Sequence, residues 1–182
     1  MAVGEDVARI AGAAEAFAAP GERLSGIVVA EPLGRRIYLC AYESEHGHGW
    51  LALDADAAPV SDRRLVQEAA SLAALCEVAE ESAGGGDLDA LRARLAELRE
   101  TDAPEGIDEA EEAAAALAGT LRPAPRIARA EYLDEIGVAA RRLEQALGED
   151  ARSPFAAAMQ QAMPAVEELT ADVERSYKGP LA

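Results

Sequence analysis

The sequence predicts an α+β fold that is mainly α, with an N-terminal helix and a three-stranded antiparallel β-meander packed on a C-terminal helical bundle of about five helices. Runs rich in β-branched and aromatic residues, which are typical of strands, occur between residues 24 and 53. Elsewhere large apolar residues recur at spacings of three and four, the period of one helix face. We expect residues 1–83 to form a small α+β unit and residues 84–182 a helical bundle, packed together as a single domain.

The N-terminal unit is predicted to begin with a helix over residues 3–19, which Pro20-Gly21 ends. Pro32 and Gly34 suit a β-turn between the first two strands, and the segment from Glu43 to Gly49 is read as a polar loop. Connections this short favour antiparallel pairing. The strands are expected at residues 24–30, 36–42 and 50–53.

The rest of the chain is predicted to be helical. Ser61 is a suitable N-cap for a helix over residues 62–82, and the glycines at 84–86 break it. Sustained alternation of three- and four-residue steps is typical of helices packed nearly antiparallel. Further helices are expected to begin at Asp87 and Ile107, to cover residues 127–147, and to run from Ser153-Pro154 to about Tyr177.

Charge restricts the classes of partner. The chain has 34 acidic and 17 basic residues, a formal net charge of −17, and a single lysine, Lys178. Recognition of nucleic-acid backbones and of anionic lipid both need clustered positive charge, so we expect no nucleic acid and no membrane as partner. An evenly acidic surface promotes solubility. The alternatives are a basic partner and mimicry of nucleic acid.

Location is predicted from what the sequence contains near its start and in its apolar runs. Glu5 and Asp6 lie where a secretory signal has positive charge, and no apolar run reaches the roughly 18 residues of a membrane span. We therefore expect a cytoplasmic protein. The bias toward alanine and arginine is typical of bacterial genomes rich in G and C.

Catalytic chemistry is poorly supplied. A serine or cysteine nucleophile needs an oriented base, and the two histidines both lie in the 43–49 segment. Cys40 and Cys76 fall at strand and helix positions that suit small core residues. We predict no catalytic residue and no cofactor, and a non-enzymatic role is favoured.

A metal site in the same segment is the alternative. His46 and His48 are two residues apart, so on an extended chain they point the same way and can share a metal with Glu43 or Glu45. Such a site would make the protein an enzyme or a metal-dependent binding module.

Aromatic residues give the other candidate surface. Tyr38, Tyr42 and Trp50 lie within thirteen residues, and a symmetric loop would place Tyr42 opposite Trp50. This aromatic sheet face is either the polar margin of a core or a surface that binds a partner or ligand.

The function expected from these observations is that of a cytoplasmic bacterial interaction protein: an adaptor, assembly factor or regulator that uses the aromatic face from Tyr38 to Trp50. A protein partner is expected, a second copy of this chain being one candidate. The alternatives are the enzyme or metal-dependent module at Glu43–Gly49 and an acidic inhibitor that mimics nucleic acid.

Overall fold

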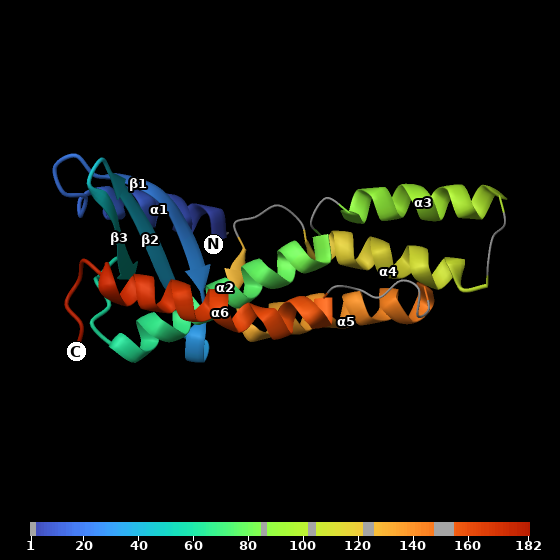
Figure 1. Cartoon of the computed structure of the whole chain (residues 1–182). Helices are drawn as coiled ribbons and strands as arrows, with labels where there is room; N and C mark the ends of the chain where they lie inside the picture. The colour runs from blue at the N-terminus through green and yellow to red at the C-terminus, as the bar shows by residue number, and fades with distance from the viewer. Residues whose placement is uncertain (1–2, 85–86, 102–104, 122–125, 148–154) are drawn as a thin grey trace. The chain divides into compact units, whose positions relative to one another are not determined.

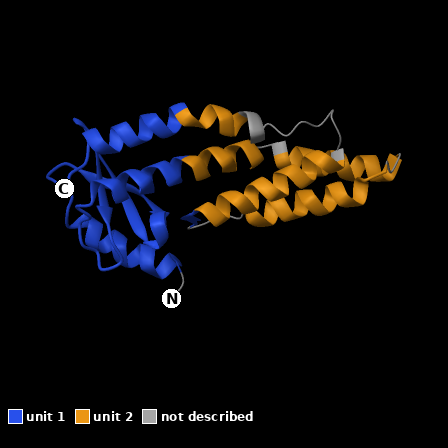
Figure 2. Cartoon of the chain, turned by 90° about the horizontal axis from the view of Figure 1, so that it is seen from below, with its two compact units in different colours: residues 1–74, 124–129, 164–182 blue, residues 75–123, 130–163 orange. Residues whose placement is uncertain are grey.

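The computed structural model of the 182-residue chain describes residues 3–84, 87–101, 105–121, 126–147 and 155–182. Gly85, Gly86, Ser153 and Pro154, where the sequence predicts a helix break and a helix start, lie outside the described residues. The fold is α+β and mostly helical. Contacts divide the chain into two compact units (Figure 2). Unit 1 comprises residues 1–74, 124–129 and 164–182, and unit 2 comprises residues 75–123 and 130–163. This division takes residues 124–129 and 164–182 together with the N-terminal part, unlike the expected split at residue 83.

Unit 1 is built around a four-stranded sheet with the order β3-β2-β1-β4 (Figure 1). The expected antiparallel meander is present, because β1 pairs with β2 and β2 with β3. The fourth strand pairs in parallel with the end of β1, at Val29 and Ala30. The strands are β1 (Arg23–Ala30), β2 (Ile37–Ser44), β3 (Gly47–Leu53) and β4 (Ile127–Ala128).

The short strand β4 corrects one helix boundary. Residues 127–147 are predicted as one helix, because Ile127 continues its apolar stripe. The structure places Ile127 and Ala128 in the sheet, and helix α5 begins at Ala130 (Ala130–Leu147). Pairing with β1 satisfies backbone groups there that a helix would otherwise satisfy, so a tertiary contact overrides the local pattern.

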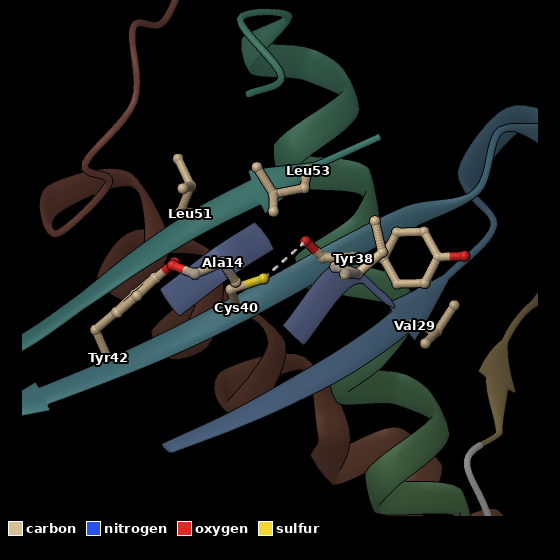
Figure 3. Packing of buried hydrophobic residues seen from close by; sticks show 8 residues of the cluster. Ala14, Val29, Tyr38, Cys40, Tyr42, Leu51 and Leu53 are labelled. Carbon is tan, nitrogen blue, oxygen red and sulfur yellow. Dashed lines mark hydrogen bonds between the residues drawn. The ribbon is translucent and has the colours of Figure 1, made fainter. Parts of the chain in front are cut away.

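Helix α1 (Val3–Glu15) covers one face of the sheet. Ile10 and Ala14 of α1 are fully buried against Tyr38, Cys40 and Tyr42 of β2. Figure 3 shows Ala14 and the three β2 side chains with Val29 of β1 and with Leu51 and Leu53 of β3 on the same face. The α1 stripe and the alternation along β2 therefore meet in one apolar cluster, as the two periods of three to four and of two require.

The opposite face of the sheet is covered by the unit 1 parts of α2 (Arg63–Gly84) and α6 (Phe155–Arg175), as Figures 1 and 2 show. Asp62, and not Ser61, caps α2, because the Leu65 N–H donates to Asp62 Oδ1 at 3.2 Å. Helix α6 ends at Arg175, and Tyr177 pairs with Trp50 instead of extending the helix.

The described residues of unit 2 are helical except for the turn residues 105–106 and 121. The unit contains the rest of α2 and α6 together with α3 (Asp87–Thr101), α4 (Ile107–Thr120) and α5. Leu95 of α3, Leu117 of α4 and Ile136 of α5 are buried, as their heptad-like spacing predicts. Arg99 of α3 forms ion pairs with Asp108 and Glu111 of α4, so two acidic residues of α4 are neutralised within unit 2.

Candidate functional site

Tyr38 and Tyr42, two of the three residues predicted to form a binding face, lie in the core of unit 1. Their exposed fractions are 1% and 0% because α1 packs on that face of the sheet. The Tyr42 hydroxyl donates a 2.7 Å hydrogen bond to the carbonyl of Ala14, which satisfies its polar group inside the core. Of the two sequence readings of the aromatic face, the structure favours the core margin for these two residues.

Trp50 projects from the other face of the sheet. The hairpin between β2 and β3 has a two-residue turn, Glu45-His46, which sets Tyr42 opposite Gly49 and Trp50 opposite Ala41. The expected Tyr42–Trp50 pair is therefore wrong. A shift of one residue in register moves every side chain of a strand to the opposite face.

Burial also keeps the Cys40 thiol and the Tyr42 hydroxyl of β2 in their neutral, unreactive forms. Desolvation raises the pKa of the Cys40 thiol to about 12. Desolvation, with smaller effects from Cys40 and Glu22, raises the pKa of Tyr42 to about 12. Both groups are neutral at physiological pH, and a neutral buried thiol is a poor nucleophile.

The four residues of the predicted metal site are spread along the hairpin. Glu43 lies opposite His48 in the register, and it accepts a 3.2 Å hydrogen bond from Arg23. His46 and Glu45 occupy the exposed turn. Within the described ranges, no three His, Cys, Asp or Glu side chains are placed to hold one metal ion.

His48 instead meets a carboxylate from α6. Its Nε2 lies 2.9 Å from each oxygen of Asp172, and Trp50 Nε1 donates to the same carboxylate at 2.9 Å. Burial of Asp172 opposes ionisation, but the hydrogen bonds from Trp50 and His48 and the charge of Arg175 outweigh it and lower the pKa of Asp172. The sequence reasoning missed Asp172, because it lies more than 120 residues from its partners.

Residues 176–182, the 176–182 segment, begin at the edge of β3, where Ser176, Tyr177 and Lys178 pair with Trp50. The Trp50 N–H donates to the Ser176 carbonyl at 2.9 Å, and the Lys178 N–H donates to the Trp50 carbonyl at 2.7 Å. Tyr177 is thus paired in parallel with Trp50, and its hydroxyl donates to the Val60 carbonyl at 2.6 Å. This short pairing covers part of a sheet edge that would otherwise offer open backbone groups.

Lys178 is held in a pocket beside that edge. Its Nζ donates to the Phe17 carbonyl at 2.9 Å, forms an ion pair with Glu22, and lies 3.9 Å from the centre of the Tyr42 ring. The hydrogen bond from Lys178 is the main cause of the lowered pKa of Glu22. The predicted surface residues Tyr42 and Trp50 therefore contact a segment of their own chain.

The turn between β1 and β2, unlike the edge of β3, leaves a large apolar side chain exposed on a left-handed backbone. Leu33 and Gly34 both have positive φ, 53° and 72°, and the Arg35 N–H donates to the Pro32 carbonyl at 3.0 Å. The sequence predicts a turn here from Pro32 and Gly34, but it gives no sign that a leucine takes the left-handed conformation. Leu33 is also 69% exposed, the largest fraction among the large apolar residues that the structure describes.

Open grooves lie among the described residues of both units. In unit 1 a groove of about 430 Å³ lies between α2 and α6 and is rich in carboxylates, including Glu68, Glu167 and Glu174. Glu174 already accepts from Gln67 and forms an ion pair with Arg63. In unit 2 a groove of about 310 Å³ lies between α3 and α4.

Comparison with known proteins assigns no family. No protein-family model, curated protein or solved structure matches the chain. None of the helices in the described residues combines the length and apolar character needed to cross a membrane.

Proposed function

We propose that the protein is a non-enzymatic interaction protein, an adaptor, assembly factor or regulator, whose partner contacts the turn from Pro32 to Gly34 at Leu33. The function class is the one that the sequence favours, but the proposed binding surface is the turn at Leu33 and not the aromatic face from Tyr38 to Trp50. Tyr38 and Tyr42 are buried, and Trp50 is engaged by α6 and the 176–182 segment, so the sheet face itself offers a partner little.

The observation that carries the proposal is the conformation of Leu33 together with its exposure. A left-handed conformation costs a residue with a Cβ roughly 1–2 kcal/mol, a cost that glycine does not have. Burial of the side chain would offset it, but Leu33 is 69% exposed. Neither the backbone nor the packing of the isolated chain therefore favours leucine at this position, and an intermolecular contact supplies the missing reason.

The surroundings of Leu33 add a charge pattern. The Glu31 N–H donates to the Ala128 carbonyl at 2.8 Å, which brings β4 beside the turn. Residues 31–36 and 126–129, with Asp6 that pairs with Arg36, contain four arginines and two acids, a local net charge of +2 on a chain of −17. Arg36 is paired with Glu31 and Asp6, and Arg35 is exposed. This pattern supports a protein partner whose contact residues are apolar with acidic neighbours.

Site-specific photocrosslinking in the native host tests the proposal. A photoreactive amino acid replaces Leu33, and a matched variant carries it at Met163, which is 52% exposed on helix α6. We expect a discrete adduct with one protein, or with a second copy of the chain, from position 33 and none from position 163. Equal labelling from both positions, or no adduct from position 33, would contradict the proposal.

A second candidate function is the enzyme or metal-dependent module at Glu43–Gly49. The contact between His48 and Asp172 favours it, because a carboxylate that holds one imidazole nitrogen orients the other toward solvent. Elemental analysis of protein purified without a histidine tag tests this candidate. Stoichiometric metal that is lost in both His48→Ala and Asp172→Asn would support it, and metal-free wild-type protein would reject it.

A further inference from the structure

The 176–182 segment is held by side chains more than by the sheet. It forms a single bridge to β3, Trp50 with Tyr177, whereas seven residue pairs join β3 to β2. Its backbone hydrogen bonds to β3 are the two at Trp50. A further backbone bond, from the Ala182 N–H to the Ser61 carbonyl at 2.7 Å, ties its end near the start of α2. With these three bonds against a continuous ladder, the segment opens at a lower free energy than the strands beneath it.

Three successive positions of this segment meet a specific environment. Tyr177 reaches the Val60 carbonyl with its hydroxyl, and Lys178 enters the pocket described above. At Gly179 a Cβ atom would lie 2.8 Å from the Tyr177 ring and 3.1 Å from Leu51 Cδ1, so a side chain cannot be added without movement. With an aromatic ring in the place of Tyr177, the edge of β3 therefore fits lysine and glycine at the next two positions.

The pocket is built for a lysine. The carboxylate of Glu22, the carbonyl of Phe17 and the face of the Tyr42 ring all point at one ammonium group. Gly49 gives the lysine stem its path, because a Cβ there would lie 2.9 Å from Lys178 Cδ. The chain uses arginine at all of its 16 other basic positions, so the only lysine coincides with the pocket that fits a compact point charge.

We propose that the edge of β3 is a binding site for an extended peptide of the pattern aromatic–lysine–glycine, occupied in cis by the 176–182 segment. A partner protein's segment with this pattern pairs with Trp50 in parallel and places its lysine in the Glu22 pocket once the chain's own segment has opened. Recognition then combines backbone pairing at a sheet edge with a side-chain pocket. This site is separate from Leu33, and neither proposal depends on the other.

Competition between the two occupants gives the test. The probe is a labelled peptide of the sequence SYKGPLA, added to the full chain and followed by anisotropy and by the fluorescence of Trp50, the only tryptophan. The tethered segment competes at an effective concentration on the order of millimolar, so Lys178→Ala is expected to bind the peptide at least about tenfold more tightly than wild type. Adding Glu22→Gln to that variant should remove the gain, and so should replacing the peptide lysine by alanine.

Two results of the peptide-binding experiment would overturn the proposal. Equal affinity of wild type and Lys178→Ala, or no binding to either folded protein at millimolar peptide, overturns the proposal. Hydrogen exchange on the unmodified full chain serves if Lys178→Ala does not fold. We expect the Lys178 amide to exchange at least about tenfold faster than the amides that pair β2 with β3. Protection equal to theirs would show a permanent strand and also overturn the proposal.

Discussion

The edge of β3 and the turn from Pro32 to Gly34 belong to the same unit. The polar side chains at the edge are paired within the chain, whereas the apolar side chain at the turn is exposed. At the β3 edge, Asp172 accepts from His48 and Trp50, and Lys178 is neutralised by Glu22. At the turn, Leu33 combines a left-handed backbone with a side chain exposed to solvent.

A residue can be retained because it stabilises the fold or because it contacts a partner, and the two regions differ in this respect. At the β3 edge each contact satisfies or neutralises a partly buried group within the chain, whatever else that edge binds. Leu33 has no such explanation, since its side chain covers little and its backbone would favour glycine. An interaction protein is expected to show this kind of local conflict where its partner binds.

The largest expected effect on stability comes from Tyr42, whose buried ring contacts Lys178 beside the edge of β3. Tyr42→Ala removes a fully buried aromatic ring and should lower the free energy of unfolding by about 3–5 kcal/mol, as large-to-small core substitutions do. Tyr42→Phe keeps the ring but loses the hydroxyl that donates to Ala14, and should cost about 1 kcal/mol. Urea unfolding followed by circular dichroism measures both. An unfolding free energy unchanged by Tyr42→Ala would mean that Tyr42 lies outside the core.

A smaller loss is expected from Asp172. Asp172→Ala leaves Trp50 Nε1 without its acceptor and should cost about 1–2 kcal/mol, because a partly buried donor is left unpaired. Asp172→Asn is the matched control and should cost less, since the amide oxygen still accepts from Trp50. Urea unfolding monitored by the single tryptophan reports directly on this contact. Equal losses in the two variants would argue against the hydrogen bond as the cause.

At the turn, replacing Leu33 by glycine is expected to raise the free energy of unfolding. Leu33→Gly removes the left-handed penalty of about 1–2 kcal/mol but adds entropy to the unfolded chain, so the net stabilisation should be about 0.5–1 kcal/mol. Ala57→Gly is the control, because Ala57 also has a positive φ of 62° but packs against the core cluster. Its methyl contacts offset the relief, and thermal melting should show a smaller gain. A lower melting temperature for Leu33→Gly would show that Leu33 stabilises the isolated chain.

Acid should loosen the edge of β3. The pKa values of Asp172 and Glu22 are lowered in the folded protein, so both carboxylates stabilise it above their unfolded pKa values, 3.8 and 4.5. That stabilisation is lost as the pH falls below those values through the folded pKa values. We expect the fluorescence of Trp50 to change in this range in wild type and the change to be reduced in Asp172→Asn. An identical titration in the two proteins would reject the role of Asp172.

The sequence was sufficient for the meander and for most of the helical stripes, because alternation along β2 and the spacing along α1 each follow from a local period. It was insufficient for the face of Trp50. A two-residue turn at Glu45-His46 sets the register there, and the polar composition of residues 43–49 does not distinguish that turn from a longer loop.

The candidate sites depended even more on distant contacts. Asp172 meets His48 only because α6 passes beside β3, and Ile127 leaves the helical pattern only because it pairs with β1. Leu33 was hidden for a different reason. Its neighbours Pro32 and Gly34 predict a turn, but which residue takes the positive φ depends on how the two strands leave it.

The central claim is that Leu33 is kept at the turn for a partner, and differential capture tests it most directly. Tagged full-length wild type, Leu33→Gly and Ala57→Gly are expressed at equal levels in the native host, and co-purifying proteins are quantified by mass spectrometry. We predict a partner that wild type and Ala57→Gly recover equally and that Leu33→Gly recovers at least about tenfold less, the effect of a lost contact worth about 1.4 kcal/mol or more. Recovery of the same proteins in the same amounts by all three would contradict the claim.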